Sequence, residues 1–190
     1  MTDRTDILTE RLIIKPAHRD MAEAVLKLHL ENRHHFRLGS PASVLDRSDL
    51  EFWYKKLQLE EKKWNDETEY GLYGYHKETQ QLICQIQISG IIRGVFQAAL
   101  IGYKIDQQYE GQGLMREAME AALKFAFDTL CLHRIMANYQ PVNERSGTLL
   151  KRLGFTIEGY ARDYLYLNGA WRDHILTALN NPGFNNKGLA

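Results

Sequence analysis

The stretch YEGQGLMREAMEAALKF, residues 109–125, places the strongest constraint on what this chain can fold into. The alternating segment 97–106 before it predicts a strand, and the residues from Leu114 onward favour a helix. Between them lie Gly111 and Gly113, the least helix-favouring residue type after proline. The first amides of such a helix lack internal partners and lie at its positive end, where a phosphate binds well. The stretch predicts either a plain strand-to-helix connection or a backbone cradle for an anion.

Two common phosphate-binding motifs do not match this turn. A P-loop requires Lys followed by Ser or Thr after the second glycine, and here Leu114 and Met115 follow. A dinucleotide-binding fingerprint requires a third glycine where the chain has Arg116. An anion cradle in this chain must therefore be of another kind.

The remaining patterns predict one mixed α/β domain over residues 8–180, followed by a C-terminal tail at 181–190. Ser48, with Glu51 three residues later, has the pattern of a capping box at a helix start. Asn168 and Gly169 predict the turn of a closing hairpin. The expected helices are 18–31, 48–64, one from 114, and 143–154; the expected strands are near 12–15, 70–76, 82–89, 97–106 and 133–140, with the hairpin at 157–179.

Charge and cysteine content exclude several classes of function. Lys plus Arg and Asp plus Glu both number 24, which leaves no overall charge to attract nucleic acid or an anionic membrane. No run of about 18 apolar residues is present, and we expect a cytoplasmic protein. Cys84 and Cys131 lack a CxxC partner, and we expect both to be buried in a reducing compartment. The RHH stretch at 33–35 lacks metal-ligand spacing, and we expect no metal site.

The order of strand, glycine turn, helix, strand RIMANY, short helix and GF resembles the Gcn5-related N-acetyltransferase superfamily. The strings NERSGTLLKRLGF, EGYARDYL and WRDH are similar to the branch of that family that acetylates the N-terminal alanine of a small-subunit ribosomal protein. The likeness covers about residues 8–182. It implies a largely antiparallel mixed sheet flanked by helices, with two splayed strands holding acetyl-CoA. It also implies direct attack of an amine on the thioester, without a covalent enzyme intermediate or a metal.

The resemblance also implies where the pyrophosphate of acetyl-CoA binds. Aligned to the helix start, the family turn Q/R-x-x-G-x-G/A covers 110–115, with departures from the family pattern at Glu110 and Met115. A second register, starting at Gln108, puts the cradle earlier relative to the helix. We expect the backbone to carry the binding and the side chain of Glu110 to point away. The implied cradle residues are Glu110, Gly111, Gln112, Gly113, Leu114 and Met115.

Other cofactor and catalytic positions follow from the same resemblance. The backbone of Tyr103, Lys104 and Ile105 would hold the pantetheine, with the Ile105 amide polarising the thioester carbonyl. Asn143 would cap the following helix, bind the coenzyme, or both. Many relatives carry a proton-donating tyrosine where this chain has Leu150. Ser146, one turn earlier, is therefore the candidate for stabilising the leaving thiolate, with helix-end structure as its alternative role.

The general base stays open. An α-amine has a pKa of about 8, against about 10.4 for lysine, so a weak base or a water relay would suffice near neutral pH. Glu31, Glu158, Asp163 and Tyr164 are candidates, each with a surface or structural role as the alternative.

The acceptor is the least constrained part of the hypothesis. The resemblance implies a small-subunit ribosomal protein N-terminus, with the ribosome or its assembly intermediates as further partners. Other N-termini, lysine, a polyamine or an antibiotic amine would suit the same chemistry, and a non-catalytic CoA-binding module is a further alternative. An acidic group could meet a basic substrate or form a solvated helix end: Glu60, Glu61, Asp66, Glu67 and Glu69.

Overall fold

The computed structural model describes residues 2–41, 44 and 46–185, and within these ranges an eight-stranded sheet organises the chain. The strands follow the order β1-β2-β3-β4-β5-β6-β8-β7, and every neighbouring pair is antiparallel except β5 and β6. Their bounds are β1 Ile7–Leu8, β2 Leu12–Pro16, β3 Tyr70–His76, β4 Leu82–Ile92, β5 Ala98–Ile105, β6 Arg134–Tyr139, β7 Thr156–Leu167 and β8 Ala170–Asn180. The mixed, largely antiparallel α/β fold expected from the sequence is confirmed.

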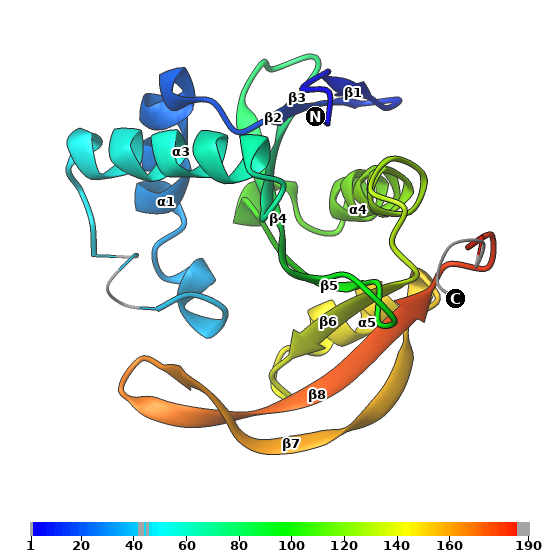
Figure 1. Ribbon diagram of the computed structural model, residues 1–190. Coiled ribbons are helices and arrows are strands. Elements are labelled where there is room, and N and C mark those ends of the chain that lie inside the picture. Colours follow the sequence, from blue (N-terminus) through cyan, green and yellow to red (C-terminus); the bar gives the residue numbers. More distant parts are fainter. Residues whose placement is uncertain (1, 42–43, 45, 186–190) are drawn as a thin grey trace.

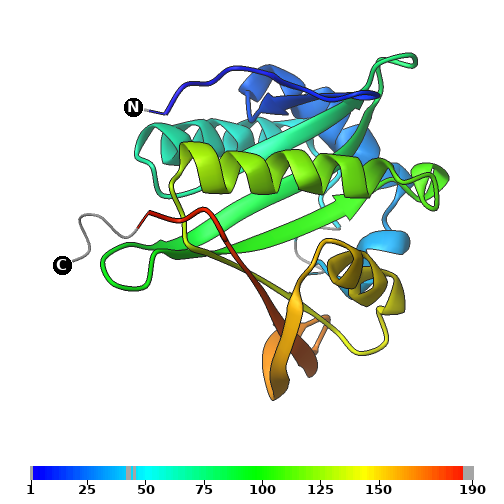
Figure 2. The same cartoon turned by 90° about the vertical axis from the view of Figure 1, so that its right-hand side faces the viewer.

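Helices cover both faces of this sheet (Figures 1 and 2). Helices α1 (Ala22–Glu31) and α3 (Leu50–Asn65) lie on one face, and α4 (Leu114–Lys124) and α5 (Glu144–Arg152) lie on the other. Three short 3-10 turns, η1 (Arg19–Met21), η2 (His35–Leu38) and η3 (Gln107–Tyr109), and a π-helical turn, η4 (Phe125–Thr129), complete the described elements. Each face has its own apolar core. Met119 and Ala122 of α4 belong to one core, and Trp53 and Leu57 of α3 belong to the other.

The parallel pair β5 and β6 separates shortly after it forms. Its register runs only from Ala98 opposite Arg134 to Leu100 opposite Met136. Beyond Met136, β6 continues to pair with β8 on its other side, and β5 continues to pair with β4. Figure 2 shows β5 and β6 diverging on the side that α5 covers. The opening between the diverging strands β5 and β6 is called the wedge below. It leaves the last residues of β5 with one open backbone edge.

Two local predictions from the sequence were wrong in detail. The helix expected over 18–31 is divided into η1 and α1. The second helix is capped by Asp49 rather than by Ser48. Asp49 has an extended backbone, and its carboxylate accepts a hydrogen bond from the Phe52 amide at 2.8 Å, which is the reach of an N-cap to the third helical residue.

The first two residues of the acidic group, Glu60 and Glu61, form neither a solvated helix end nor a substrate surface. Glu60 and Glu61 are buried, with exposed fractions of 4% and 7%. The Tyr73 hydroxyl donates to Glu60 at 2.7 Å, and Arg19 forms an ion pair with Glu61 at 2.8 Å. Both carboxylates lie between α3 and neighbouring elements, where buried charges require partners. Their partners are internal, so these two carboxylates face the packing contacts of α3 rather than a substrate.

The cysteines also differ from the expectation. Cys84 is buried on β4, and burial raises the pKa of its thiol to about 12. Cys131 is exposed, because it lies in the turn after η4 with a left-handed backbone (φ 51°). Among the described residues, no helix is long and apolar enough to cross a membrane.

Candidate active site

The open edge of β5 presents backbone amides to the wedge. The Asp106 amide donates to the Ile83 carbonyl of β4 at 2.8 Å. Successive amides of a strand point to opposite sides, so the N–H groups of Ile105 and Tyr103 point away from β4 and toward β6. Because β6 has already diverged there, these two amides can bind a ligand that enters as an extended chain.

The glycine turn at the end of this strand has the geometry of an anion cradle. Gly111 and Gly113 both have left-handed backbones, with φ of 74° and 78°, which explains why glycine occupies both positions. Gly113 is the N-cap of α4 and provides no side-chain cap. The Glu117 amide is bonded to the Gly113 carbonyl at 3.1 Å, so the amides before Glu117 lack partners within the helix. A Cβ on Gly111 would meet no atom within 4 Å, so the turn faces open space.

This geometry fits the turn register that starts at Gln108 better than the register that starts at Glu110. Both left-handed glycines immediately precede the helix, so the register from Gln108 does not place the cradle too early. The register from Glu110 instead puts its last small position at Met115, whose side chain is buried in the core beneath α4. Leu114 is buried beside it. Leu114 and Met115 can therefore offer only their backbone amides to a ligand.

Arg11, in the turn between β1 and β2, supports the cradle and was missed in the sequence. Its guanidinium donates to the Gln112 carbonyl at 2.9 Å and to the Glu117 carboxylate at 2.8 Å. The Arg11 amide and the Thr9 hydroxyl also donate to Glu117, at 2.7 and 2.6 Å. No local pattern signals this contact, because Arg11 and Glu117 are 106 residues apart.

We expect Glu117→Gln to lower the free energy of unfolding at pH 7 by about 1–3 kcal/mol, as for loss of hydrogen bonds to a charged group. Burial works to raise the pKa of Glu117, but hydrogen bonds from Thr9 and Arg11 hold it below its ordinary value of 4.5. A depressed carboxylate pKa stabilises the fold above pH 4.5, and the contribution is lost as the pH falls through the folded-state value. The stability deficit of the variant in urea unfolding should therefore shrink as the pH is lowered from 7 to below 4.5. Glu120→Gln, on the exposed face of α4, is the matched control; an equal deficit at both pH values would contradict the assignment.

Across the wedge, Tyr103 and Ser146 form a pair of hydroxyl groups. The two oxygens lie 2.6 Å apart, and the Asn143 side chain caps α5 by accepting from the Ser146 amide at 3.2 Å. Burial raises the pKa of Tyr103 to about 12, so its phenol stays protonated at neutral pH. Leu150 is buried in the core and leaves no room for a proton donor at that position. The sequence pointed only to the backbone of Tyr103, and the structure adds its hydroxyl as a candidate beside Ser146.

Lys104 points to the opposite face of the sheet from Tyr103. Its ammonium donates to the Ser40 hydroxyl at 3.0 Å and lies 5.3 Å from the centre of the Phe36 ring. Burial lowers the pKa of Lys104 to about 8. Only its backbone borders the wedge.

Glu110 does not extend freely into solvent. Its carboxylate lies 3.1 Å from Nε2 of His35, in η2, and forms an ion pair with Arg145, in the first turn of α5. Burial, followed by the charge of Arg145, lowers the pKa of His35 below its ordinary value of 6.5. Neither His35 nor Arg145 was among the candidate residues, because nothing local in the sequence connects them to the glycine turn.

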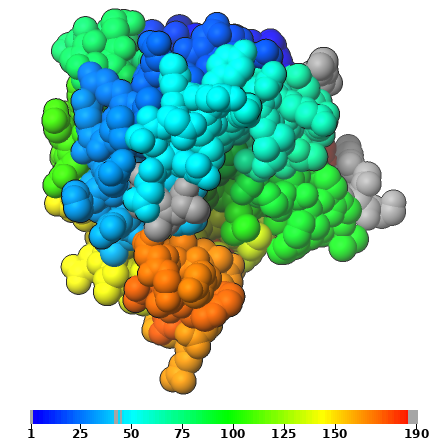
Figure 3. All heavy atoms as spheres, turned by 90° about the vertical axis from the view of Figure 1, so that its left-hand side faces the viewer, coloured from blue at the N-terminus to red at the C-terminus, as the bar shows by residue number. Residues whose placement is uncertain are grey.

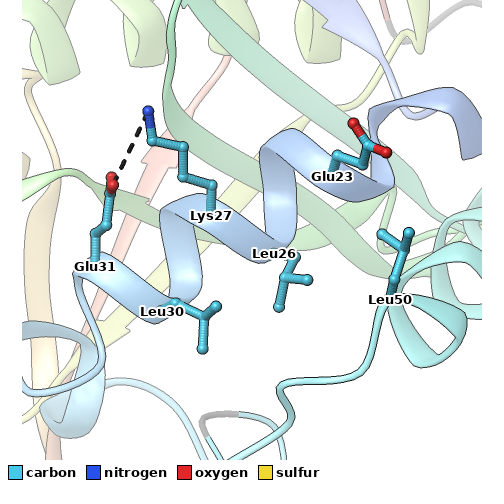
Figure 4. Close-up of a pocket in the computed structure, with 6 residues that line it drawn as sticks. All are labelled: Glu23, Leu26, Lys27, Leu30, Glu31 and Leu50. Atoms are coloured by element: carbon cyan, nitrogen blue, oxygen red, sulfur yellow. Dashed lines mark ion pairs between the residues drawn. The ribbon is translucent and has the colours of Figure 1, made fainter.

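Two of the four candidate bases lie in ion pairs. Glu31 lies 3.9 Å from Lys27 on the outer face of α1. Figure 4 shows this pair beside Leu26 and Leu30, which line a shallow cavity of about 270 Å3 whose lining contains no serine, cysteine or histidine. Glu158 is paired with Arg134 at the start of β6.

The other two bases belong to the β7–β8 hairpin. The Asp163 amide donates to the Asp173 carboxylate at 2.9 Å. The Tyr164 hydroxyl accepts from the Asn138 side chain at 3.0 Å, and Asn138 lies on the part of β6 that no longer pairs with β5. Tyr164 therefore contacts the part of β6 that has diverged from β5, whereas Glu158 contacts the paired start of β6.

A second cavity, of about 540 Å3, lies between η2, the β6–α5 connection and the β7–β8 hairpin. The hairpin extends beneath η2 in Figure 3. The Asn168 side chain donates to the Arg37 carbonyl at 2.6 Å, and the Gln140 side chain donates to the Leu38 carbonyl. Trp171 and Tyr160, both more than half exposed, contribute aromatic surface to this cavity.

Comparison with known families shows to which class of protein this site belongs. Residues 11–156 match the acetyltransferase (GNAT) domain family. The chain belongs to this family and is an N-acetyltransferase, which confirms the resemblance seen in the sequence.

Its relatives include enzymes named for ribosomal proteins. The chain is 39% identical to the [ribosomal protein uS5]-alanine N-acetyltransferase of Escherichia coli K12, over 93% of this chain and 91% of that protein. The ribosomal-protein-S5-alanine acetyltransferase of Vibrio fischeri superposes with a TM-score of 0.88 at 32% identity, covering 95% of this chain and 99% of the other. RimJ of Mycobacterium smegmatis, solved in complex with CoA-disulfide, superposes with a TM-score of 0.83 at 26% identity, covering 89% and 81%.

Proposed function

We propose that this protein transfers the acetyl group of acetyl-CoA to the N-terminal alanine of a small-subunit ribosomal protein. The observation that supports the chemistry is the divergence of β5 from β6, with two free amides leading to a glycine cradle. The acceptor is inferred from the 39% identity to the uS5-alanine enzyme. Such an acceptor would place the protein in the cytoplasm, in contact with ribosomes or their assembly intermediates.

Each part of the site has a task in this reaction. Bound acetyl-CoA supplies an activated acetyl thioester. The backbone of the glycine turn and of the first turn of α4 holds the pyrophosphate, and the amides of Tyr103 and Ile105 hold the pantetheine arm. The Ile105 N–H stabilises the negative charge that develops on the thioester oxygen. Asn143 orients α5, and through it Ser146.

The leaving sulfur requires a hydrogen-bond donor. Ser146 provides one, and the Tyr103 hydroxyl, 2.6 Å away, orients it while staying protonated. The proton that the attacking amine loses passes through solvent and finally protonates the released thiolate, so neither hydroxyl is consumed. The acceptor α-amine, with a pKa of about 8, needs little assistance to lose its own proton. Cys84 is buried on β4 with a raised pKa, which agrees with direct transfer rather than an acyl-cysteine intermediate.

The acceptor assignment is tested with peptides. The purified protein is incubated with acetyl-CoA and Ala-starting peptides from a small-subunit ribosomal protein, while free thiol release and the acetylated position are measured. The same peptides with a blocked N-terminus and an internal lysine are the controls. We expect acetylation of the α-amine and no turnover of the blocked peptides.

Other outcomes would select the alternatives. Transfer only to lysine, or only to a polyamine or antibiotic amine, would reject the N-terminal acceptor while leaving the transferase chemistry in place. Tight CoA binding without transfer to any acceptor would favour a non-catalytic CoA-binding module.

A further inference from the structure

Glu110 presents an electrostatic problem at the cradle. Its carboxylate precedes Gly111 directly, and a negative charge there would repel a pyrophosphate. The side chain is only 18% exposed, and the basic groups beside it, on His35 and Arg145, come from outside the turn. Some positive charge must offset the carboxylate if the turn is to bind phosphate.

Arg145 is better suited than His35 to supply this charge. The pKa of His35 lies below 6.5, so its imidazole is neutral at pH 7. The Arg145 guanidinium stays charged, its side chain is 76% exposed, and Glu110 is the carboxylate it contacts. A guanidinium carries five N–H donors, so donors remain available for a second partner beside Glu110.

The position of Arg145 on its helix supports a functional role. It lies in the first turn of α5, where the helix dipole disfavours a positive charge. From there its side chain extends from the α5 side of the wedge to the turn that ends β5. The contact therefore joins the two sides between which acetyl-CoA would bind.

We propose that Arg145 is a pyrophosphate ligand for CoA, supplied from α5, and that Glu110 holds it beside the glycine cradle. This inference rests on the proposed function, because it adds a side-chain contact to the same cofactor site. Arg145 neutralises Glu110 and offers a planar pair of donors to the phosphate oxygens. The turn thus obtains from a distant helix the positive charge that its own Glu110 opposes.

The test measures the dissociation constants of CoA, dephospho-CoA and pantetheine by calorimetry, with competition for the weakest ligand. We expect Arg145→Met to weaken CoA and dephospho-CoA binding by about tenfold or more, as for loss of a charge-assisted hydrogen bond, and to change pantetheine binding less than twofold. Arg145→Lys should give an intermediate CoA affinity, because lysine keeps the positive charge but lacks the planar pair of N–H donors. Arg152→Met is the matched control, because it removes an exposed arginine from the last turn of the same helix. It should change each of the three dissociation constants less than twofold.

A second variant tests the neutralisation of Glu110. In the Arg145→Met background, Glu110→Gln should recover at least threefold of the lost CoA affinity, because it removes an unpaired carboxylate from the phosphate site. No recovery would show that Glu110 does not face the phosphates and would overturn this part of the proposal.

The remaining outcomes separate this inference from the proposed function. If wild-type protein does not bind CoA, the cradle itself is misassigned. If wild type binds CoA and Arg145→Met binds it equally well, only the role of Arg145 fails. An equal loss for pantetheine would indicate a structural effect, and a loss confined to CoA but absent for dephospho-CoA would move the contact to the 3′-phosphate; either result would overturn the pyrophosphate assignment.

Discussion

Replacing Gly113 with aspartate is expected to weaken CoA binding about hundredfold or more. Gly113 has a φ of 78°, and a non-glycine residue held in that region costs about 1–3 kcal/mol. The new carboxylate would also lie at the N-terminus of α4, where it would compete with the pyrophosphate for the same amides. Its Cβ would lie 3.5 Å from Nη2 of Arg11, so the carboxylate would attract the guanidinium that supports Gln112 and Glu117.

The measurement is the dissociation constant of CoA by calorimetry, with urea unfolding to show that the variant is folded. Gly94→Asp is the matched control, because Gly94 is also left-handed (φ 69°), and a Cβ there would meet no atom within 4 Å. We expect Gly94→Asp to leave the dissociation constant within twofold of wild type. A folded Gly113→Asp protein with CoA affinity within threefold of wild type would place the pyrophosphate elsewhere.

Removing either hydroxyl of the Tyr103–Ser146 pair is expected to lower kcat by about 10²-fold, the size of a typical general-acid contribution. Ser146→Ala removes the donor nearest to the proposed position of the sulfur, and Tyr103→Phe removes the hydroxyl 2.6 Å away that orients it. Because the two groups act as a unit, the double variant should lose little more than either single variant. The dissociation constant of acetyl-CoA should change much less than kcat.

Steady-state and single-turnover kinetics with an Ala-starting peptide measure these effects. Ser89→Ala, on β4, provides the same substitution away from the wedge and should keep wild-type kcat. The pKa of Tyr103, raised to about 12 by burial, predicts that this phenol produces no inflection in the rate profile below pH 10. Full additivity of the two losses would show that the hydroxyls act independently.

Local patterns were sufficient for the elements that carry the site. The glycine turn, the strand before it and the helix after it lie where the sequence placed them, because strand alternation and glycine punctuation reflect backbone hydrogen bonding along a continuous stretch. Asn143 caps α5 for the same local reason. Asn168 and Gly169, both with positive φ, form the expected hairpin turn.

Errors arose where a choice among neighbouring residues depended on packing. Ser48 and Asp49 are both capable N-caps, and the structure uses Asp49. The register of the glycine turn, which stays a prediction, also depends on packing, because both registers contain glycines. The burial of Met115 beneath α4 distinguishes them, and burial depends on the sheet that α4 covers.

The sequence by itself determined the mixed α/β architecture and the position of the glycine turn, because both depend on periodicity and spacing within short stretches. It indicated the family through the resemblance of its strings to known members. Only the tertiary structure decided which side chains complete the site: Arg11 beside Glu117, Tyr103 beside Ser146, and His35 and Arg145 beside Glu110. These contacts join residues up to 106 positions apart. Their physical basis is the divergence of β5 from β6 and the packing of helices from both halves of the chain around that opening, which no local pattern encodes.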